Sequence, residues 1–351
     1  MKRLRSAPWC ALLAAACLAL SGCRTLADRI VTPDGPDLLP ANLAQIERHA
    51  GVRAARFAAD DGVVLWYREL APAQRGLEYT FERRADGMSL SLRFRDAGAA
   101  ADSAQATVVL LHGWGADGGS MLPWGLALGE RGYRTILVDL RGHGRSRPSS
   151  PGFGPREGAD VAALVAALRA SGGLQEPLYL MGVSHGAVAA LHAAALLGEE
   201  VAGIVAISPY ASARQGIHGV VESVRQMRGG GLRARAAGGW ARWRYHEDRV
   251  DAAMRVAGRR LGLDLASIDT GPAVEALRAC TLVLHGTDDG LFDLQDVEAL
   301  ARRSPLARFV ALQDETHVTA PLRIDLLAAP LADWFAQVPR APCPSFTAPA
   351  R

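Results

Sequence analysis

A serine set between two glycines is the strongest candidate for chemistry in this chain. Residues 182–186 read Gly-Val-Ser-His-Gly. The apolar run at 177–184 predicts a strand leading to the serine, and residues 186–197 predict a helix after it. In such a strand–turn–helix unit the glycines let strand and helix approach closely, so the hydroxyl of Ser184 projects above the sheet. The helix N-terminus favours developing negative charge, and Ser184 is therefore predicted to be a nucleophile.

An acid and a base follow the serine along the chain. Residues 284–289 read Leu-His-Gly-Thr-Asp-Asp at the end of a predicted strand, so Asp288 and Asp289 are both candidates for the acid. His317 lies between the last predicted strand, at 307–314, and the final predicted helix, at 320–336. In this arrangement the imidazole removes the serine proton, while the carboxylate fixes the imidazole tautomer and stabilises its charged form. The predicted chemistry is formation of an acyl-enzyme that water hydrolyses.

Acyl transfer also needs two preorganised donors that stabilise an oxyanion. The backbone N–H of His185, the residue after the nucleophile, is one candidate. Residues 112–115 read His-Gly-Trp-Gly at the end of a strand predicted for 107–113, and this loop is the candidate source of the second donor. His112 precedes the serine in the chain, so we expect its imidazole to be structural and hydrogen-bonded within the loop.

Together these motifs resemble those of the α/β-hydrolase family, in the branch that holds esterases, monoacylglycerol lipases and serine-aminopeptidase-like hydrolases. The resemblance implies that Asp289 is the acid, because it stands last in an H-G-x-x-D motif. It also implies that the N–H of Trp114 is the second oxyanion donor. Residues 141–146 after Asp139 match the family's D-x-R-G-x-G-x-S motif, for which we expect a structural role. A serine nucleophile distinguishes the chain from the dehalogenase and epoxide-hydrolase branches, which use aspartate.

The elements around these motifs predict an α/β fold. Short apolar strands alternate with helices between residues 107 and 336, which predicts a mostly parallel central sheet flanked by helices on both faces. Three β-rich segments, at 63–67, 77–81 and 88–94, predict antiparallel N-terminal strands. The α/β-hydrolase fold, which the resemblance implies over roughly residues 105–337, has this arrangement. We expect one domain at 51–340, followed by a proline-rich tail at 341–351.

A long segment interrupts the alternation. Residues 211–270 exceed an ordinary crossover and predict a helical lid insertion. Its tryptophans, Trp240 and Trp243, are candidates to line an acyl pocket or to contact a membrane, and core packing is the alternative. The segment holds eleven arginines and six acidic residues, which we interpret as a solvated helical face rather than a site for anionic lipid.

The N-terminus predicts a signal for export. Three basic residues among the first five precede an apolar run at 7–20 that is too short to span a bilayer. Residues 20–23 read Leu-Ser-Gly-Cys, which resembles the lipobox of bacterial lipoproteins and implies that a signal peptide, residues 1–22, is cleaved and that Cys23 is acylated. Two or more acyl chains give a stable anchor. Arg24 then favours the periplasmic face of the outer membrane, with 23–50 as a linker ending in a short helix. An ordinary cleaved signal peptide is the alternative.

Composition excludes some classes of partner. A formal net charge of +3 is too small to indicate a nucleic acid. The histidines lack metal-ligand spacing, so we expect neither a metal nor another cofactor. Cys280 and Cys343 remain after signal cleavage, where an oxidising compartment permits a disulfide; two free thiols are the alternative. The oligomeric state is left open.

The function predicted is hydrolysis of a carboxylic ester, as in a carboxylesterase or lipase-like enzyme anchored at the cell envelope and acting on a small acyl substrate. A peptidase or amidase of the same fold is the second reading. A catalytically silent envelope binding protein is the third, and the complete set of serine, histidine and aspartate speaks against it.

Overall fold

A computed structural model describes residues 25–33, 43–59, 61–84, 87–95, 104–225, 236, 239, 245–340 and 343–349. The predicted signal peptide at 1–22, the predicted lipidation site Cys23, and the lid tryptophans Trp240 and Trp243 lie outside the described residues. In the described part of the chain no helix is long and apolar enough to cross a membrane.

The central sheet is mixed and mostly parallel. The strands are β1 (Arg53–Ala58), β2 (Val64–Leu70), β3 (Glu78–Arg84), β4 (Gly87–Arg93), β5 (Ala106–Leu111), β6 (Tyr133–Val138), β7 (Leu178–Val183), β8 (Gly203–Ile207), β9 (Cys280–Gly286) and β10 (Ala307–Leu312). Within the described residues, eight of them form one sheet in the order β1-β2-β6-β5-β7-β8-β9-β10. β2 is antiparallel to both its neighbours, β1 and β6, whereas the six strands from β6 through β5, β7, β8 and β9 to β10 pair in parallel with one another. The predicted fold class is confirmed.

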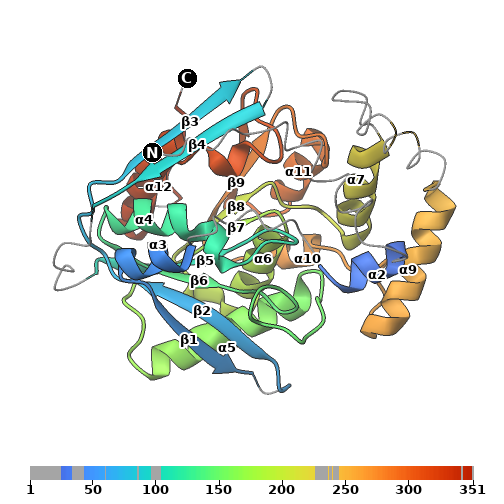
Figure 1. Cartoon of the computed structure of the whole chain (residues 1–351), viewed down its shortest axis with the longest axis horizontal. Helices are drawn as coiled ribbons and strands as arrows, with labels where there is room; N and C mark the ends of the chain where they lie inside the picture. The colour runs from blue at the N-terminus through green and yellow to red at the C-terminus, as the bar shows by residue number, and fades with distance from the viewer. Residues whose placement is uncertain are drawn as a thin grey trace.

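Helices cover both faces of this sheet (Figure 1). They are α2 (Leu26–Val31), α3 (Leu43–Ala50), α4 (Leu122–Gly129), α5 (Pro155–Ala170), α6 (His185–Leu197), α7 (Ala213–Arg225), α9 (Glu247–Leu261), α10 (Gly271–Glu275), α11 (Leu294–Ala301) and α12 (Ile324–Gln337), with short 3₁₀ turns at Gly118–Met121, Gly198–Glu200, Ala320–Leu322 and Val338–Arg340. Buried side chains of α5, α6, α10 and α11 share one apolar cluster with the sheet. Those of α4 and α12 share a second cluster on the other face. Because helices bury both faces of the sheet, its central strands are continuous apolar runs.

The predicted lid contains α7 and α9 in its described part. Their inward faces, including Val221 and Met254, form a third apolar cluster. That cluster also takes in α2, whose Ala27 and Ile30 are buried, and Asp28 of α2 pairs with Arg260 of α9 at 2.5 Å. The first described helix therefore packs on helices of the predicted lid, an arrangement that the expected linker over 23–50 does not include.

The N-terminal strands divide between two sheets. β1 and β2 extend the central sheet, whereas β3 and β4, among the residues that the structure describes, pair with each other alone as a ribbon. Arg83 of this ribbon makes an ion pair with Glu315 in the loop that follows β10, and the Tyr79 hydroxyl donates to the Leu322 carbonyl at 2.7 Å. The ribbon thus packs over the loop that carries His317.

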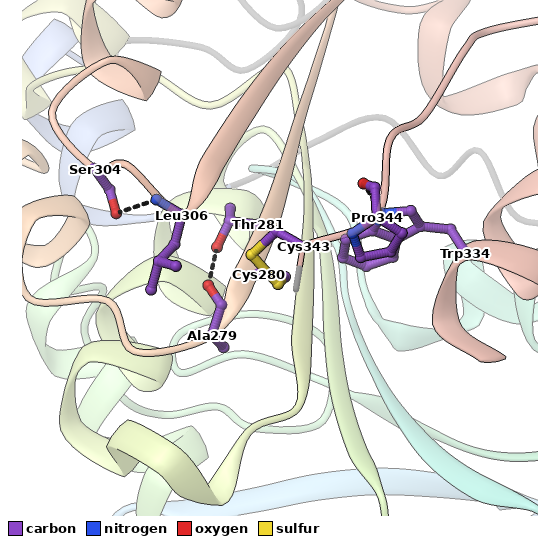
Figure 2. The surroundings of a disulfide bond; sticks show 8 residues. All are labelled: Ala279, Cys280, Thr281, Ser304, Leu306, Trp334, Cys343 and Pro344. Atoms are coloured by element: carbon purple, nitrogen blue, oxygen red, sulfur yellow. Dashed lines mark hydrogen bonds between the residues drawn. A yellow bond between two sulfur atoms is a disulfide. The ribbon is translucent and has the colours of Figure 1, made fainter. Parts of the chain in front are cut away.

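The tail is covalently attached to the sheet. Cys280, the first residue of β9, forms a disulfide with Cys343 across a sequence separation of 63 (Figure 2). Trp334 of α12 donates from its indole N–H to the Pro344 carbonyl at 3.1 Å beside it. Of the two alternatives for these cysteines, the disulfide is therefore the one observed.

Candidate active site

Ser184 occupies a sharp turn between β7 and α6. Its φ of 53° and ψ of −115° lie in a region that non-glycine residues rarely adopt. A Cβ atom at Gly182 would lie 2.1 Å from the Gly186 carbonyl oxygen, and one at Gly186 would lie 2.3 Å from the Leu111 carbonyl oxygen. Both positions therefore need glycine, as the sequence motif predicts, because helix α6 touches strand β7 at Gly182 and the end of strand β5 at Gly186.

Two long-range hydrogen bonds join Ser184 to a histidine and an aspartate. Nε2 of His317 lies 3.0 Å from Oγ of Ser184, and Nδ1 of His317 lies 2.8 Å from Oδ2 of Asp289. The neighbouring Asp288 is exposed, and its Oδ1 accepts from the Thr287 hydroxyl at 3.4 Å. Of the two candidate acids, Asp289 is the one that the fold brings to His317.

The surroundings of Asp289 hold its carboxylate in place. The side chain is 1 % exposed, and its Oδ1 accepts the backbone N–H groups of Leu291 at 2.8 Å and Phe292 at 3.1 Å. Burial raises the pKa of Asp289. The hydrogen bond and charge of His317, the attraction of His285 and the Leu291 N–H lower the pKa by more than burial raises it, so the net shift is downward. The carboxylate is therefore ionised at neutral pH, in position to orient His317.

The two candidate oxyanion donors belong to segments that adjoin the serine. His185 is the first residue of α6, so its N–H is one of those that a helix leaves without an intrahelical acceptor. On the other side, a Cβ at Gly113 would lie 3.6 Å from Cβ of Ser184. The next residue, Trp114, sets its ring edge-on to the His185 ring, with centroids 5.2 Å apart. The fold thus brings Gly113, the residue before one predicted donor, and His185, the other predicted donor, next to Ser184.

His112 lies close by but is occupied within its loop, as the sequence analysis expects. Its Nδ1 lies 2.8 Å from the Gly113 carbonyl, and its Nε2 accepts the Leu140 N–H at 3.0 Å. Burial lowers its pKa to about 4, so the ring is neutral at pH 7. A neutral ring with both nitrogens bonded to backbone stabilises the loop and has no free nitrogen for proton transfer.

The motif that begins at Asp139 also has structural contacts. The Asp139 carboxylate is fully buried and accepts the backbone N–H groups of Gly118 and Arg145 at 2.8 Å each, together with a 2.6 Å ion pair from Arg68. Arg141 forms a bidentate ion pair with Asp160 of α5, in which Nε donates to Oδ2 and Nη2 donates to Oδ1, each at 2.6 Å. These bonds tie together the loops that surround the 112–115 segment.

Three residues near the site had no signal in the sequence analysis. Phe292 stands edge-on to the His317 ring, with centroids 4.9 Å apart. Tyr210, which follows β8, has its hydroxyl 2.8 Å from Nδ1 of His185. Glu157 faces the other nitrogen of the same ring. An acid in the first helical turn after Gly154-Pro155 is a usual helix start, so the pattern indicates where α5 begins and nothing about the burial of Glu157.

A groove lies between helices of the predicted lid and the segment that follows Asp289. It has a volume of about 340 Å³, lies between α7, α9 and residues 291–296, and its wall includes Val221, Val250 and Leu291. Leu291 is also the residue whose N–H contacts Asp289. Over the described ranges, no group of three or more histidine, cysteine, aspartate or glutamate side chains has the arrangement of a metal site.

Comparisons with known proteins agree with this architecture. The model of the alpha/beta hydrolase family matches residues 108–334. An esterase from Pyrococcus furiosus superposes with a TM-score of 0.59 at 16 % identity, over 88 % of this chain and 97 % of that one. A bacterial membrane phospholipase A gives 0.54 at 21 % identity, over 85 % and 92 %. An esterase from Thermogutta terrifontis gives 0.51 at 22 % identity, over 82 % and 99 %. Among curated protein sequences, none matches the chain.

Proposed function

Because the chain belongs to the alpha/beta hydrolase family, we propose that it is a serine hydrolase that cleaves carboxylic esters through an acyl-enzyme. Ser184 is the nucleophile in this proposal, His317 the general base and acid, and Asp289 the residue that orients the base. The observation that carries the proposal is the unbroken row of hydrogen bonds from Asp289 through His317 to Ser184, at 2.8 and 3.0 Å.

The reaction follows from these positions. His317 takes the hydroxyl proton as Oγ of Ser184 bonds to the ester carbonyl carbon, and the carbonyl oxygen becomes an oxyanion between the N–H groups of Trp114 and His185. The C–O bond to the alcohol then breaks, and the imidazolium returns the proton to the departing oxygen. His317 then takes a proton from water as the water oxygen bonds to the acyl carbon. The bond between that carbon and Oγ breaks, and His317 returns the proton to Oγ, which releases the acid and restores Ser184.

Esters are favoured over amides as substrates by the relatives of known fold. The superposable structures include two esterases and a phospholipase A, whose names are those of ester hydrolases. A peptidase or amidase is the competing function, and the rates with p-nitrophenyl esters of increasing acyl length and with aminoacyl p-nitroanilides separate the two. Faster turnover of the anilides would replace the proposal by its competitor.

The decisive experiment is covalent labelling of the full-length protein in detergent with a fluorescent fluorophosphonate. We expect labelling of wild type and of Ser267→Ala, which removes an exposed lid serine, and no labelling of Ser184→Ala. Absence of labelling in a folded wild-type protein would favour the silent binding protein instead.

For location, we propose a lipid anchor on Cys23 at the periplasmic face of the outer membrane. The disulfide supports an oxidising compartment. Thr25, which caps α2, stands two residues after Cys23, and two extended residues reach at most about 7 Å. Since α2 packs on α9, an acyl chain on Cys23 would attach beside the lid. Cys23→Ala is expected to abolish incorporation of radiolabelled palmitate and to release the protein from membranes; unchanged incorporation would rule out this site.

A further inference from the structure

Glu157 is a buried carboxylate that the proposed mechanism leaves without a role. It lies in the first turn of α5 and is 0 % exposed. Its Oε1 accepts the Gly152 N–H at 2.5 Å, and its Oε2 accepts the Gly154 N–H at 2.7 Å. Its Oε1 also lies 3.5 Å from Nε2 of His185, an ion-pair separation. A charge so far from solvent is costly unless it is paired. Of its partners, His185 adjoins Ser184, and Gly152 and Gly154 belong to a turn whose Phe153 packs on Trp114.

These contacts keep Glu157 ionised. Burial raises its pKa, but the electrostatic attraction of His185 and the hydrogen bonds from the N–H groups of Gly152 and Gly154 lower it more, to about 2. The position at the N-terminus of α5 adds to this effect, because a helix N-terminus stabilises negative charge. The carboxylate therefore holds its partners over the whole physiological pH range.

The first connection runs to the donor that follows the nucleophile. The imidazole of His185 is fully buried; its Nδ1 lies 2.8 Å from the Tyr210 hydroxyl, and its Nε2 faces Oε1 of Glu157 at 3.5 Å. The backbone N–H of the same residue is the predicted oxyanion donor. Fixing the ring at two points limits rotation of that peptide, which adjoins the strained Ser184.

The second connection runs to the other donor. Gly152 and Gly154, both bonded to Glu157, flank Phe153, whose backbone has a φ of 58°. The Phe153 ring packs on the Trp114 ring with centroids 4.9 Å apart. The Trp114 ring also contacts the His185 ring, with centroids 5.2 Å apart, and the centroids of Phe153 and His185 are 6.2 Å apart. The segment that carries the second donor is thus packed against a turn that the same carboxylate holds.

We propose that Glu157 is a positioning residue shared by both backbone donors of the oxyanion hole, and that Tyr210 completes its hold on His185. The inference rests on the proposed function, because an oxyanion hole has meaning only for an acyl-transfer enzyme. No substrate contact is assigned to either residue. Removing one oxyanion donor outright costs about 10² to 10³ in kcat, so loosening both without removing them is expected to cost less.

The test compares variants that keep shape but lose one property. Glu157→Gln retains the side-chain outline and loses the charge, and we expect kcat for p-nitrophenyl butyrate to fall about 10- to 100-fold while KM stays within about twofold. Affinity for a trifluoromethyl ketone, whose serine adduct carries an oxyanion, should fall by a similar factor. Tyr210→Phe removes one hydroxyl and should lower kcat about 3- to 10-fold.

The controls separate positioning from stability and from the proposed function. Glu176→Gln, which changes a half-exposed carboxylate paired with Arg169, is expected to match wild type in every readout. If Glu157→Gln does not fold, Tyr210→Phe still decides. Unchanged kcat and ketone affinity in the folded variants would overturn the inference. The amide NMR signals of Trp114 and His185 give a readout that needs no turnover: both should shift in Glu157→Gln even if wild type proves inactive, and unshifted signals would contradict the positioning role.

Discussion

The molecule contains two rows of carboxylate, imidazole and hydroxyl that meet at neighbouring residues. Asp289, His317 and Ser184 form one, with separations of 2.8 and 3.0 Å. Glu157, His185 and Tyr210 form the other, with separations of 3.5 and 2.8 Å. The His317 side chain is 12 % exposed and the His185 side chain is 0 % exposed. We call them the open row and the buried row.

The difference teaches that this combination of groups is not sufficient for nucleophilic chemistry. Burial, and secondarily the charge of Glu157, raises the pKa of Tyr210 well above its usual value, so its hydroxyl stays protonated. Ser184 instead stands on a turn with strained backbone angles, next to the segments of the predicted oxyanion donors. In our two proposals the same three groups therefore support chemistry in the open row and hold backbone in the buried row.

The largest effect is expected from the acid of the open row. Asp289→Asn keeps the shape but favours the wrong imidazole tautomer, so kcat should fall about 10⁴-fold, far more than Glu157→Gln in the buried row. Asp288→Asn is the matched control, since its exposed side chain does not contact His317, and should stay within about twofold of wild type. Steady-state kinetics on p-nitrophenyl butyrate checks this. Equal losses in Asp289→Asn and Glu157→Gln would remove the distinction between the rows.

Removal of the disulfide should act on stability rather than on catalysis. Cys280→Ser with Cys343→Ser opens a loop with a sequence separation of 63, for which chain entropy predicts a loss of about 4 kcal/mol. Denaturant unfolding at pH 7 measures it, with wild type under reducing conditions as a second comparison. The loop contains Asp289 and His317 but no member of the buried row, so kcat in the folded variant should change little. A drop in kcat without a drop in stability would show that the crosslink acts on the open row directly.

Acid should destabilise the protein through the histidines around the buried row. Burial lowers the pKa of His192 from 6.5 to about 4 and lowers that of His143 as well. Because the folded-state pKa is depressed, the stability that each neutral ring contributes is complete above about pH 6.5 and is lost as the pH falls toward 4. For His192 the full loss is about 3 kcal/mol. Unfolding midpoints between pH 7 and 4 should fall less steeply in His192→Gln than in wild type or in His49→Gln, an exposed control; equal slopes would contradict this.

The smallest effect is expected at the β3–β4 ribbon. Arg83 pairs with Glu315, two residues before His317, but its side chain is 37 % exposed, so the pair contributes at most about 1 kcal/mol. Arg83→Ala should lower kcat about two- to threefold and leave the buried row untouched. Arg84→Ala, which removes an exposed neighbour paired within the ribbon, is the control. A tenfold loss in Arg83→Ala would mean that the ribbon sets the position of His317.

The sequence predicts the parallel strands and the glycine turn at Ser184 because their signals are local. The apolar run that leads into Gly182-Val183-Ser184 predicts a buried strand followed by a tight turn without reference to any distant segment. Two adjacent aspartates cannot be told apart in a sequence. His317 contacts Asp289 rather than Asp288 because of the turn after β9, where backbone N–H groups donate to the Asp289 carboxylate. The resemblance to the family pointed to Asp289 where the residues alone left both open.

The remaining features depend on contacts between distant segments. Glu157, His185 and Tyr210 come from α5, α6 and the end of β8, and no periodicity indicates that they meet. Helix α2 has only six residues, and its stability comes from burying Ala27 and Ile30 on α9. Because that contact is with a distant segment, the local sequence, which contains prolines, predicts a linker instead of a helix. The separation of β3 and β4 from the central sheet is likewise a matter of tertiary packing, since alternation of side chains is the same in both sheets.

The positions of Cys280 and Cys343 in the chain determine when the disulfide can form during synthesis and export. Ser184 and the sheet as far as β8 precede Cys280 in the chain, whereas Asp289 and His317 both lie between Cys280 and Cys343. A polypeptide still emerging from a ribosome or a translocation channel carries the serine long before it has the acid and the base. The covalent ring around those two residues closes only after α12 has been delivered and an oxidant reaches both thiols. A chain that remains on the reducing side of a membrane therefore lacks the crosslink that encloses two of its three proposed catalytic groups.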